Sequence, residues 1–283
     1  MIYAGRMTLS ARNDFFKGGI TLSAVSLVLI AAGGYFAFPA YPEAAAAAAM
    51  RSRGLLQIII ENRVQASAFI PFYSMLGASV YSLISIIIIY HFFEKTQCPE
   101  IFFFGLFVVS LSFEFVRLLL PLKNIYPYPS VYLVTSSRLL LFGRYFGLFS
   151  IFAAAVYSAG LDVQRQQSVF FILVLSSLII ALNVPVDSLV WDSSLKVYSG
   201  YDKMFAMLEG GILAVTMLTF FVSAHTRGSR TYVSIGIGAF VVLAGRDILL
   251  CSDTWITVIP GLLMLALGTW YICTRLHREY LWI

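Results

Sequence analysis

The chain has 283 residues, of which 60% are hydrophobic and only 12% are charged, and its formal net charge is +5. Soluble domains contain roughly a quarter charged residues, so this composition excludes a protein that is mainly soluble. Its 19 lysines and arginines are scattered over loops and predicted helix ends without forming a basic cluster. No nucleic-acid partner is therefore expected.

The apolar residues gather in several long runs, which give the chain a mean hydropathy of +0.86. Each run has about 20 residues, the length that a helix needs to cross the hydrocarbon core of a bilayer. Strands of a membrane barrel would instead appear as short alternating segments. The sequence therefore predicts an all-α fold, a polytopic integral membrane helical bundle of about eight transmembrane helices, one N-terminal helix plus seven.

The first apolar run covers residues 18–38 and follows the basic residues Arg12 and Lys17. This order is typical of a signal anchor, because the apolar region of a cleaved signal peptide has about 7–15 residues. Cleavage near the alanines at 44–49 is the alternative. Residues 1–38 are predicted to form a cytoplasmic N-terminus and the first transmembrane helix.

Residues 39–67 are expected to form a short extracytoplasmic segment. The segment contains a run of alanines, the basic residues Arg51 and Arg53, and Glu61, so it is too short and too charged to span a membrane. A helix lying on the membrane surface is expected there, with Gly54 as a break. A small strand is the alternative.

The remainder of the chain, residues 68–275, is predicted to form a bundle of seven membrane-spanning helices. The expected spans cover residues 68–92, 101–122, 131–159, 168–186, 204–224, 231–250 and 254–275. Pro185 and Asp187 are expected to stop the fourth of these spans on the outer side. Residues 276–283 are expected to form a cytoplasmic tail.

The distribution of basic residues predicts the orientation of the chain. Eight spans place both termini on the same side of the membrane, and short cytoplasmic loops carry the excess of lysine and arginine. That side would hold Arg6, Arg12, Lys17, Lys95, Arg165, Arg227, Arg230, Arg275 and Arg278. The opposite side mixes basic and acidic residues. Both termini are therefore predicted to be cytoplasmic.

Charged residues inside the apolar spans are the best pointer to a functional site. In hydrocarbon each costs at least ~2.5 kcal/mol, so such residues normally face a protein interior or a wet cavity. The candidate ligand-binding residues are Glu114, Arg117, Arg138, Arg144, Glu209, Arg246 and Asp247. With the predicted orientation, Arg144 lies near the middle of the membrane, and the others lie in the outer half.

These charges predict an outward-facing polar pocket for an anionic ligand or a lipid head group. The set contains four arginines and three carboxylates, an excess of one positive charge. The guanidinium fork binds carboxylate or phosphate through two parallel hydrogen bonds. The alternative is structural. Glu114 and Arg117 are three residues apart and can pair within one helix. Arginines near the interface can also extend to lipid head groups.

Glycines in two spans predict close helix packing. Gly143 and Gly147 form a GxxxG motif around Arg144, a spacing that lets two helices approach closely. The span 231–250 presents a second set of small residues, including Gly245. Packing is the favoured interpretation of both sets, and a hinge is the alternative for the second.

The sequence contains no recognisable catalytic motif. A phosphate-binding glycine loop, a His-Glu-x-x-His zinc motif and a serine nucleophile elbow are all missing. His91, His225 and His277 occur singly at predicted span ends, so no metal site and no cofactor is expected. An enzyme could use only carboxylates and arginines.

The arrangement of one N-terminal span, a short external segment and seven further spans resembles the bacterial seven-transmembrane receptors with diverse intracellular signalling modules. The likeness covers about residues 70–278. It rests on Tyr81 and the apolar run after it, the short charged turn 91–100, and aromatic-rich second and third spans of the seven. In that family the seven spans connect an external sensing domain to a cytoplasmic kinase or cyclase domain.

The resemblance implies a receptor-like module in the inner membrane of a bacterium. The external segment has about 25 residues, and the chain ends eight residues after Arg275, so signalling would pass through a separate cytoplasmic protein. The alternatives are a non-catalytic assembly subunit that binds a membrane partner, a transporter of an anionic substrate, and an enzyme acting on a lipid-linked substrate. In the enzyme, Glu114, Glu209 or Asp247 would act as base, and arginines would bind phosphate.

Overall fold

The computed structural model describes residues 8–37, 69–96, 98–125, 129–191, 195, 197–252 and 254–281. Within these ranges, eight helices are long and apolar enough to cross a membrane. The predicted all-α membrane bundle is therefore confirmed, and the protein is an integral membrane protein in contact with a lipid bilayer. The external segment predicted at 39–67 lies outside the described residues.

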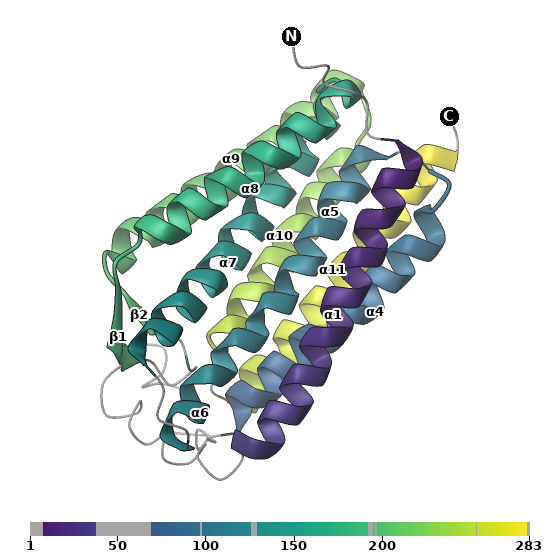
Figure 1. The fold of residues 1–283 in the computed structure, drawn as a ribbon. Helices are drawn as coiled ribbons and strands as arrows, with labels where there is room; N and C mark the ends of the chain where they lie inside the picture. Colours follow the sequence, from purple (N-terminus) through teal and green to yellow (C-terminus); the bar gives the residue numbers. More distant parts are fainter. Residues whose placement is uncertain are drawn as a thin grey trace.

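The helices run side by side along the bundle (Figure 1). They are α1 (Leu9–Ala37), α4 (Ile70–Phe93), α5 (Pro99–Ser110), η2 (Leu111–Leu118), α6 (Leu119–Ile125), α7 (Ser130–Ser158), η3 (Val163–Arg165), α8 (Gln166–Asn183), α9 (Asp202–Arg227), α10 (Thr231–Leu250) and α11 (Trp255–Leu281). Helices α8 and α9 form one side of the bundle, and α1 and α4 form the other. The start of α1 and the end of α11 lie at the same end.

Helix α1 begins at Leu9, earlier than the predicted apolar run, and it therefore includes Arg12. The side chain of Arg12 is only 4% exposed. Its Nη2 donates to the carbonyls of Phe93 and Glu94, both at 2.8 Å, and Nη1 donates to the carbonyl of Thr96. The last carbonyls of a helix have no partner within the helix, so Arg12 caps the end of α4.

Buried serines join α1 to its neighbours. The Ser23 hydroxyl lies 3.0 Å from the Ser82 hydroxyl of α4 and 2.7 Å from the Ser112 hydroxyl of η2. Ser26 and Ser79 form a second pair at 3.0 Å. Since hydrocarbon gives no hydrophobic drive for association, small residues and hydrogen bonds between helices stabilise such contacts. Helix α1 is thus packed as part of the bundle.

The predicted span 101–122 is divided into three parts, α5, η2 and α6. The middle part, η2, is a 3₁₀ helix that contains Glu114 and Arg117. In a 3₁₀ helix the side chains at positions i and i+3 are eclipsed, so these two residues project from the same side. The predicted pairing of the two residues within one helix is therefore retained in the tighter winding. Apolar periodicity alone does not distinguish it from an α helix.

The glycines pack helices closely, as predicted. A Cβ atom on Gly245 of α10 would lie 2.8 Å from the Cβ of Met264 and 3.0 Å from the carbonyl oxygen of Gly261, both on α11. A Cβ atom on Gly143 of α7 would lie 2.8 Å from the Cβ of Phe113 in η2. Both glycine sets therefore serve packing between neighbouring helices.

A short hairpin follows α8, which ends at Asn183 before Pro185, at the predicted stop. Strand β1 (Val186–Trp191) pairs antiparallel with β2 (Val197–Ser199), with an irregular register between them. The hairpin lies at the end of the bundle opposite the start of α1 (Figure 1). It was not predicted, because its short strands have no extended alternating pattern.

Helix α11 continues to Leu281, beyond the predicted end of its span at residue 275. The first residues of the predicted tail are therefore helical. The additional turns carry Arg278 and Glu279, whose charges mark the point where the helix leaves the apolar part of the sequence.

Candidate functional site

A cavity of about 290 Å³ lies between α7, α9 and α10. Four of the seven candidate charges line it. Its walls are formed by Arg144 and Leu148 of α7, by Ala206, Glu209, Gly210 and Leu213 of α9, and by Leu243, Arg246 and Asp247 of α10. A polar cluster enclosed by apolar side chains is the usual form of a small-ligand site.

Arg144 and Glu209 form an ion pair across this cavity. The Nη2 of Arg144 donates to the Oε2 of Glu209 at 2.7 Å. The side chains are 30% and 17% exposed, so the pair is partly open to the cavity. Arg144 Nε has no hydrogen-bond partner. The pair fixes the position of α9 against α7 and occupies only part of the binding capacity of the guanidinium.

Arg246 is buried in the wall of the cavity and is only 3% exposed. Its Nε has no hydrogen-bond partner, and no ion pair involving Arg246 occurs in the described part of the chain. Glu114, Glu209 and Asp247 lie within electrostatic range, as does the like charge of Arg144. A buried cation without direct partners is costly, so this guanidinium requires water or a ligand in the cavity.

Asp247 is the fourth charge in the cavity wall. It is exposed, unlike its neighbour Arg246. No ion pair of Asp247 is found within the described ranges. The four charges sum to zero, so the excess of arginine predicted for the whole set does not lie in this cavity.

Glu114 and Arg117 pair with each other instead of joining the cavity. The Nη1 of Arg117 donates to the Oε2 of Glu114 at 3.1 Å, and the side chains of Arg117 and Glu114 are 1% and 7% exposed, respectively. Arg117 also borders a void of about 10 Å³ beside Ser136 and Ser137. This void is about the size of one water molecule.

Arg138 is the one candidate outside both groups. It is half-buried on α7, its Nε has no hydrogen-bond partner, and it does not line the cavity. The seven candidates therefore separate into three groups: four residues that line the cavity, the ion pair of Glu114 with Arg117, and Arg138, which belongs to neither.

The cavity lies towards the hairpin end of the bundle. Glu209 is seven residues from the start of α9, a distance of about 10 Å, and Arg246 is four residues from the end of α10, about 6 Å. Arg144 is fourteen residues into α7, about 21 Å from its start. Arg144 is thus the deepest member of the cavity group.

The lining of the cavity limits the chemistry it can perform. Among the described residues, the lining contains two guanidinium groups and two carboxylates, but no serine, cysteine or histidine. Across the described residues, no cluster of three or more histidine, cysteine, aspartate or glutamate side chains forms a metal site. The arrangement can bind an anionic group or a zwitterion, and it offers no nucleophile beyond a carboxylate.

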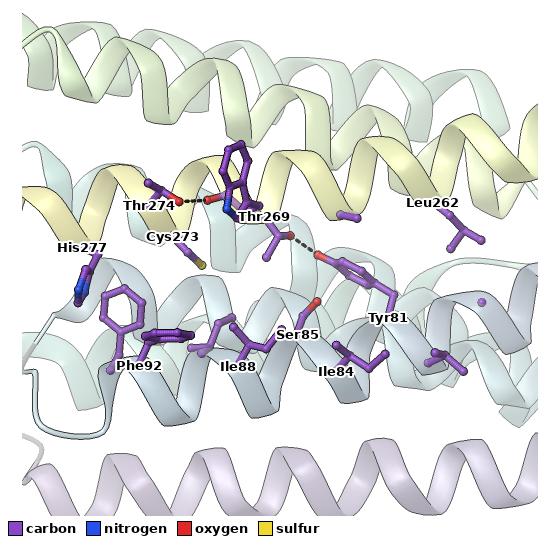
Figure 2. A pocket seen from close by; sticks show the side chains of 16 residues that line it. Tyr81, Ile84, Ser85, Ile88, Phe92, Leu262, Thr269, Cys273, Thr274 and His277 are labelled. Atoms are coloured by element: carbon purple, nitrogen blue, oxygen red, sulfur yellow. Dashed lines mark hydrogen bonds between the residues drawn. The ribbon is translucent and has the colours of Figure 1, made fainter.

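A second cavity of about 590 Å³ lies between α4 and α11. Figure 2 shows Tyr81 and Thr269 facing each other across it, with His277 at one end beside Phe92. The Tyr81 and Thr269 hydroxyls are hydrogen-bonded. No sequence pattern indicated this groove, because its lining residues are of the same apolar types that face lipid elsewhere.

Comparisons with known proteins assign no activity. No family model matches the chain, and no solved structure matches it. The chain is similar to an "uncharacterized protein" of Treponema pallidum (strain Nichols), with 23% identity over 239 residues that cover 67% of this chain and 69% of the relative.

Proposed function

We propose that this protein is a receptor-like membrane sensor that binds a small anionic ligand in the cavity between α7, α9 and α10 and acts through a separate cytoplasmic partner. The observation that carries the proposal is Arg246, a buried guanidinium in the wall of a cavity, whose Nε has no hydrogen-bond partner and which forms no ion pair among the described residues. A carboxylate or phosphate would supply that partner.

The surroundings of Arg246 favour a charged ligand over a neutral one. Leu148, Leu213 and Leu243 border the cavity, so water is partly excluded and electrostatic attraction is stronger than in bulk solvent. The guanidinium fork can accept a carboxylate through two hydrogen bonds. The carboxylate of Asp247, which forms no ion pair among the described residues, would favour a ligand that also carries an amino group.

Helix α9 provides a physical route from this cavity to the other end of the bundle. A bound anion would compete with Glu209 for Arg144 and so weaken the link between α7 and α9. At its far end, Arg227 of α9 donates to the Tyr232 hydroxyl at 2.6 Å and to the Tyr157 carbonyl at 3.2 Å. A ligand that favours one position of α9 would shift these contacts.

The distribution of basic residues supports an outward-facing cavity. Under the positive-inside rule we infer that both chain termini are cytoplasmic and that the hairpin end is outside, in a bacterial inner membrane. The cavity would then receive ligands from outside, and the His225–Arg227 end of α9 would face the cytoplasmic partner. The likeness to seven-transmembrane receptors agrees with this direction of signalling.

Thermal unfolding of the purified protein tests the proposal. We expect one carboxylate or phosphate compound to stabilise the wild type, by about 2.7 kcal/mol at a hundredfold excess over its Kd. The stabilisation should be lost in Arg246→Gln and retained in Arg138→Gln, an arginine outside the cavity. The proposal would be overturned if the anion stabilised both variants equally. It would also be overturned if no anion stabilised the wild type.

A structural role as an assembly subunit is the second candidate. It is favoured by the pairing of Glu114 with Arg117 and of Arg144 with Glu209, since charges paired within the chain need no ligand. In that case anions would not stabilise the wild type, and a second membrane protein would co-purify with the chain. Loss of co-purification in Arg138→Gln would locate the contact at Arg138 of α7.

A further inference from the structure

The groove between α4 and α11 is long as well as large. It extends from Gly77 and Leu262 to Phe93 and His277. Sixteen residues of α4 separate its ends, a length of about 24 Å, which approaches the ~30 Å thickness of a hydrocarbon core. A small soluble metabolite would fill little of this space. The shape fits a chain molecule.

The groove is apolar along most of its length. The hydroxyls of Tyr81 and Thr269 bond to each other, and Thr274 donates to the Trp270 carbonyl at 2.7 Å (Figure 2). These polar atoms are therefore already paired within the protein. Because both walls belong to membrane-spanning helices, the neighbouring medium is hydrocarbon. The matching occupant is a hydrocarbon chain.

One end of the groove is polar and basic. His277 lies there, with its ring 5.7 Å from that of Phe93 and 6.3 Å from that of Phe92. The helix ends that meet at this point carry the basic residues His91, Lys95, Arg275 and Arg278 and the acidic residues Glu94 and Glu279. His277 lines the groove, and the neighbouring basic groups outnumber the acidic ones. Glu279 accepts a hydrogen bond from Ser229 at 2.9 Å, and Arg275 lies over the ring of Tyr271.

We propose that this groove is a binding site for an anionic phospholipid, with one acyl chain along α4 and α11 and the phosphate at the His277 end. The charge of this end complements a phosphate, and juxtamembrane basic residues attract anionic lipids. The site is separate from the cavity at Arg246 and lies between different helices.

A second transmembrane helix fits the groove less well. Helix contacts in membranes favour small residues that let backbones approach. Here large side chains project beside the groove, among them Phe92, 59% exposed, and Trp270, 67% exposed. A flexible chain can pass between such side chains, whereas a helix of about 10 Å diameter cannot approach the backbone behind them.

Fluorescence of Trp270 tests the site directly, because this side chain lines the groove. The full-length protein with Trp191, Trp255 and Trp282 replaced by Phe would be reconstituted in phosphatidylcholine vesicles. A minor fraction of the lipid would carry brominated chains that quench tryptophan, on either phosphatidylglycerol or phosphatidylcholine. We expect brominated phosphatidylglycerol to be about fivefold more effective as a quencher than brominated phosphatidylcholine. This preference corresponds to the attraction of an anionic lipid by one basic residue.

Matched variants separate groove binding from general lipid contact. Ala266→Phe fills the groove and should abolish the preference, whereas Leu267→Phe, at an exposed neighbour outside the lining, should retain it. His277→Ala should reduce the preference without removing quenching. A variant in which Trp255 is the one remaining tryptophan should be quenched equally by the two brominated lipids, because Trp255 does not line the groove.

Two results would overturn the proposal. Equal quenching of Trp270 by both brominated lipids would show that the groove contacts only bulk lipid. Absence of quenching by either lipid, together with a disulfide between two chains in the Ile84→Cys or Ile88→Cys variant, would show that a second copy covers the groove.

Discussion

Arg144 of α7 and Glu209 of α9 are joined at 2.7 Å, and among the described residues theirs is the one ion pair between different helices. Helix α9 is otherwise largely exposed on the surface of the protein. The pair therefore links α9 to α7 at the wall of the candidate ligand cavity.

Arg144→Leu should destabilise the protein by about 1–3 kcal/mol, because it leaves Glu209 charged and partly buried without its partner. Glu209→Gln should cost a similar amount. The double variant should cost less than the sum of the two, since the second change removes the unpaired group left by the first. Equilibrium unfolding in detergent measures all three. Additive losses would show that the two side chains are not energetically coupled.

Arg246→Met is expected to act in the opposite direction on stability. It replaces a buried guanidinium without a direct partner by an apolar side chain, so the unliganded protein should gain about 1–3 kcal/mol. Binding of the stabilising anion should be lost. The same unfolding experiment, with and without anion, reports both effects. A variant that is destabilised without ligand would instead identify Arg246 as a structural residue.

The sequence predicted the fold class and most helix positions because the bilayer imposes a simple rule on length and polarity. The span 231–250 agrees with α10, and Pro185 marked the end of α8. Local winding follows no such rule, so the 3₁₀ segment at Glu114 was not apparent. The start of α1 was placed too late because Arg12 looked like a charge outside the membrane, whereas it caps α4.

The candidate site was only partly predictable for a similar reason. Charge within an apolar span identified Arg144, Glu209, Arg246 and Asp247, which share one cavity, and also Arg138, which does not. Depth along a helix can be estimated from sequence, but the direction in which a side chain points depends on how neighbouring helices rotate and cross. Those angles are set by packing details such as the close contact at Gly245.

Gly245→Ala should destabilise the bundle by about 1–3 kcal/mol, because its new methyl group would press on Met264 and on the backbone of Gly261. Gly210→Ala is the matched control on α9. Apart from the neighbouring backbone of its own helix, no atom lies within 4 Å of the position that its methyl group would take, and alanine is the better helix former. Thermal unfolding of the two variants should therefore shift in opposite directions. Equal shifts would contradict close packing at Gly245.

Arg12→Met should loosen the junction of α1 with α4. The guanidinium donates to the carbonyls of Phe93, Glu94 and Thr96, and hydrogen bonds from a charged donor each contribute about 1.5–3 kcal/mol. We expect faster amide hydrogen exchange at residues 94–96 and a lower unfolding temperature. Lys17→Met, at an exposed position on the same helix, should change neither. Unchanged exchange at 94–96 in Arg12→Met would show that the end of α4 is stabilised without the arginine.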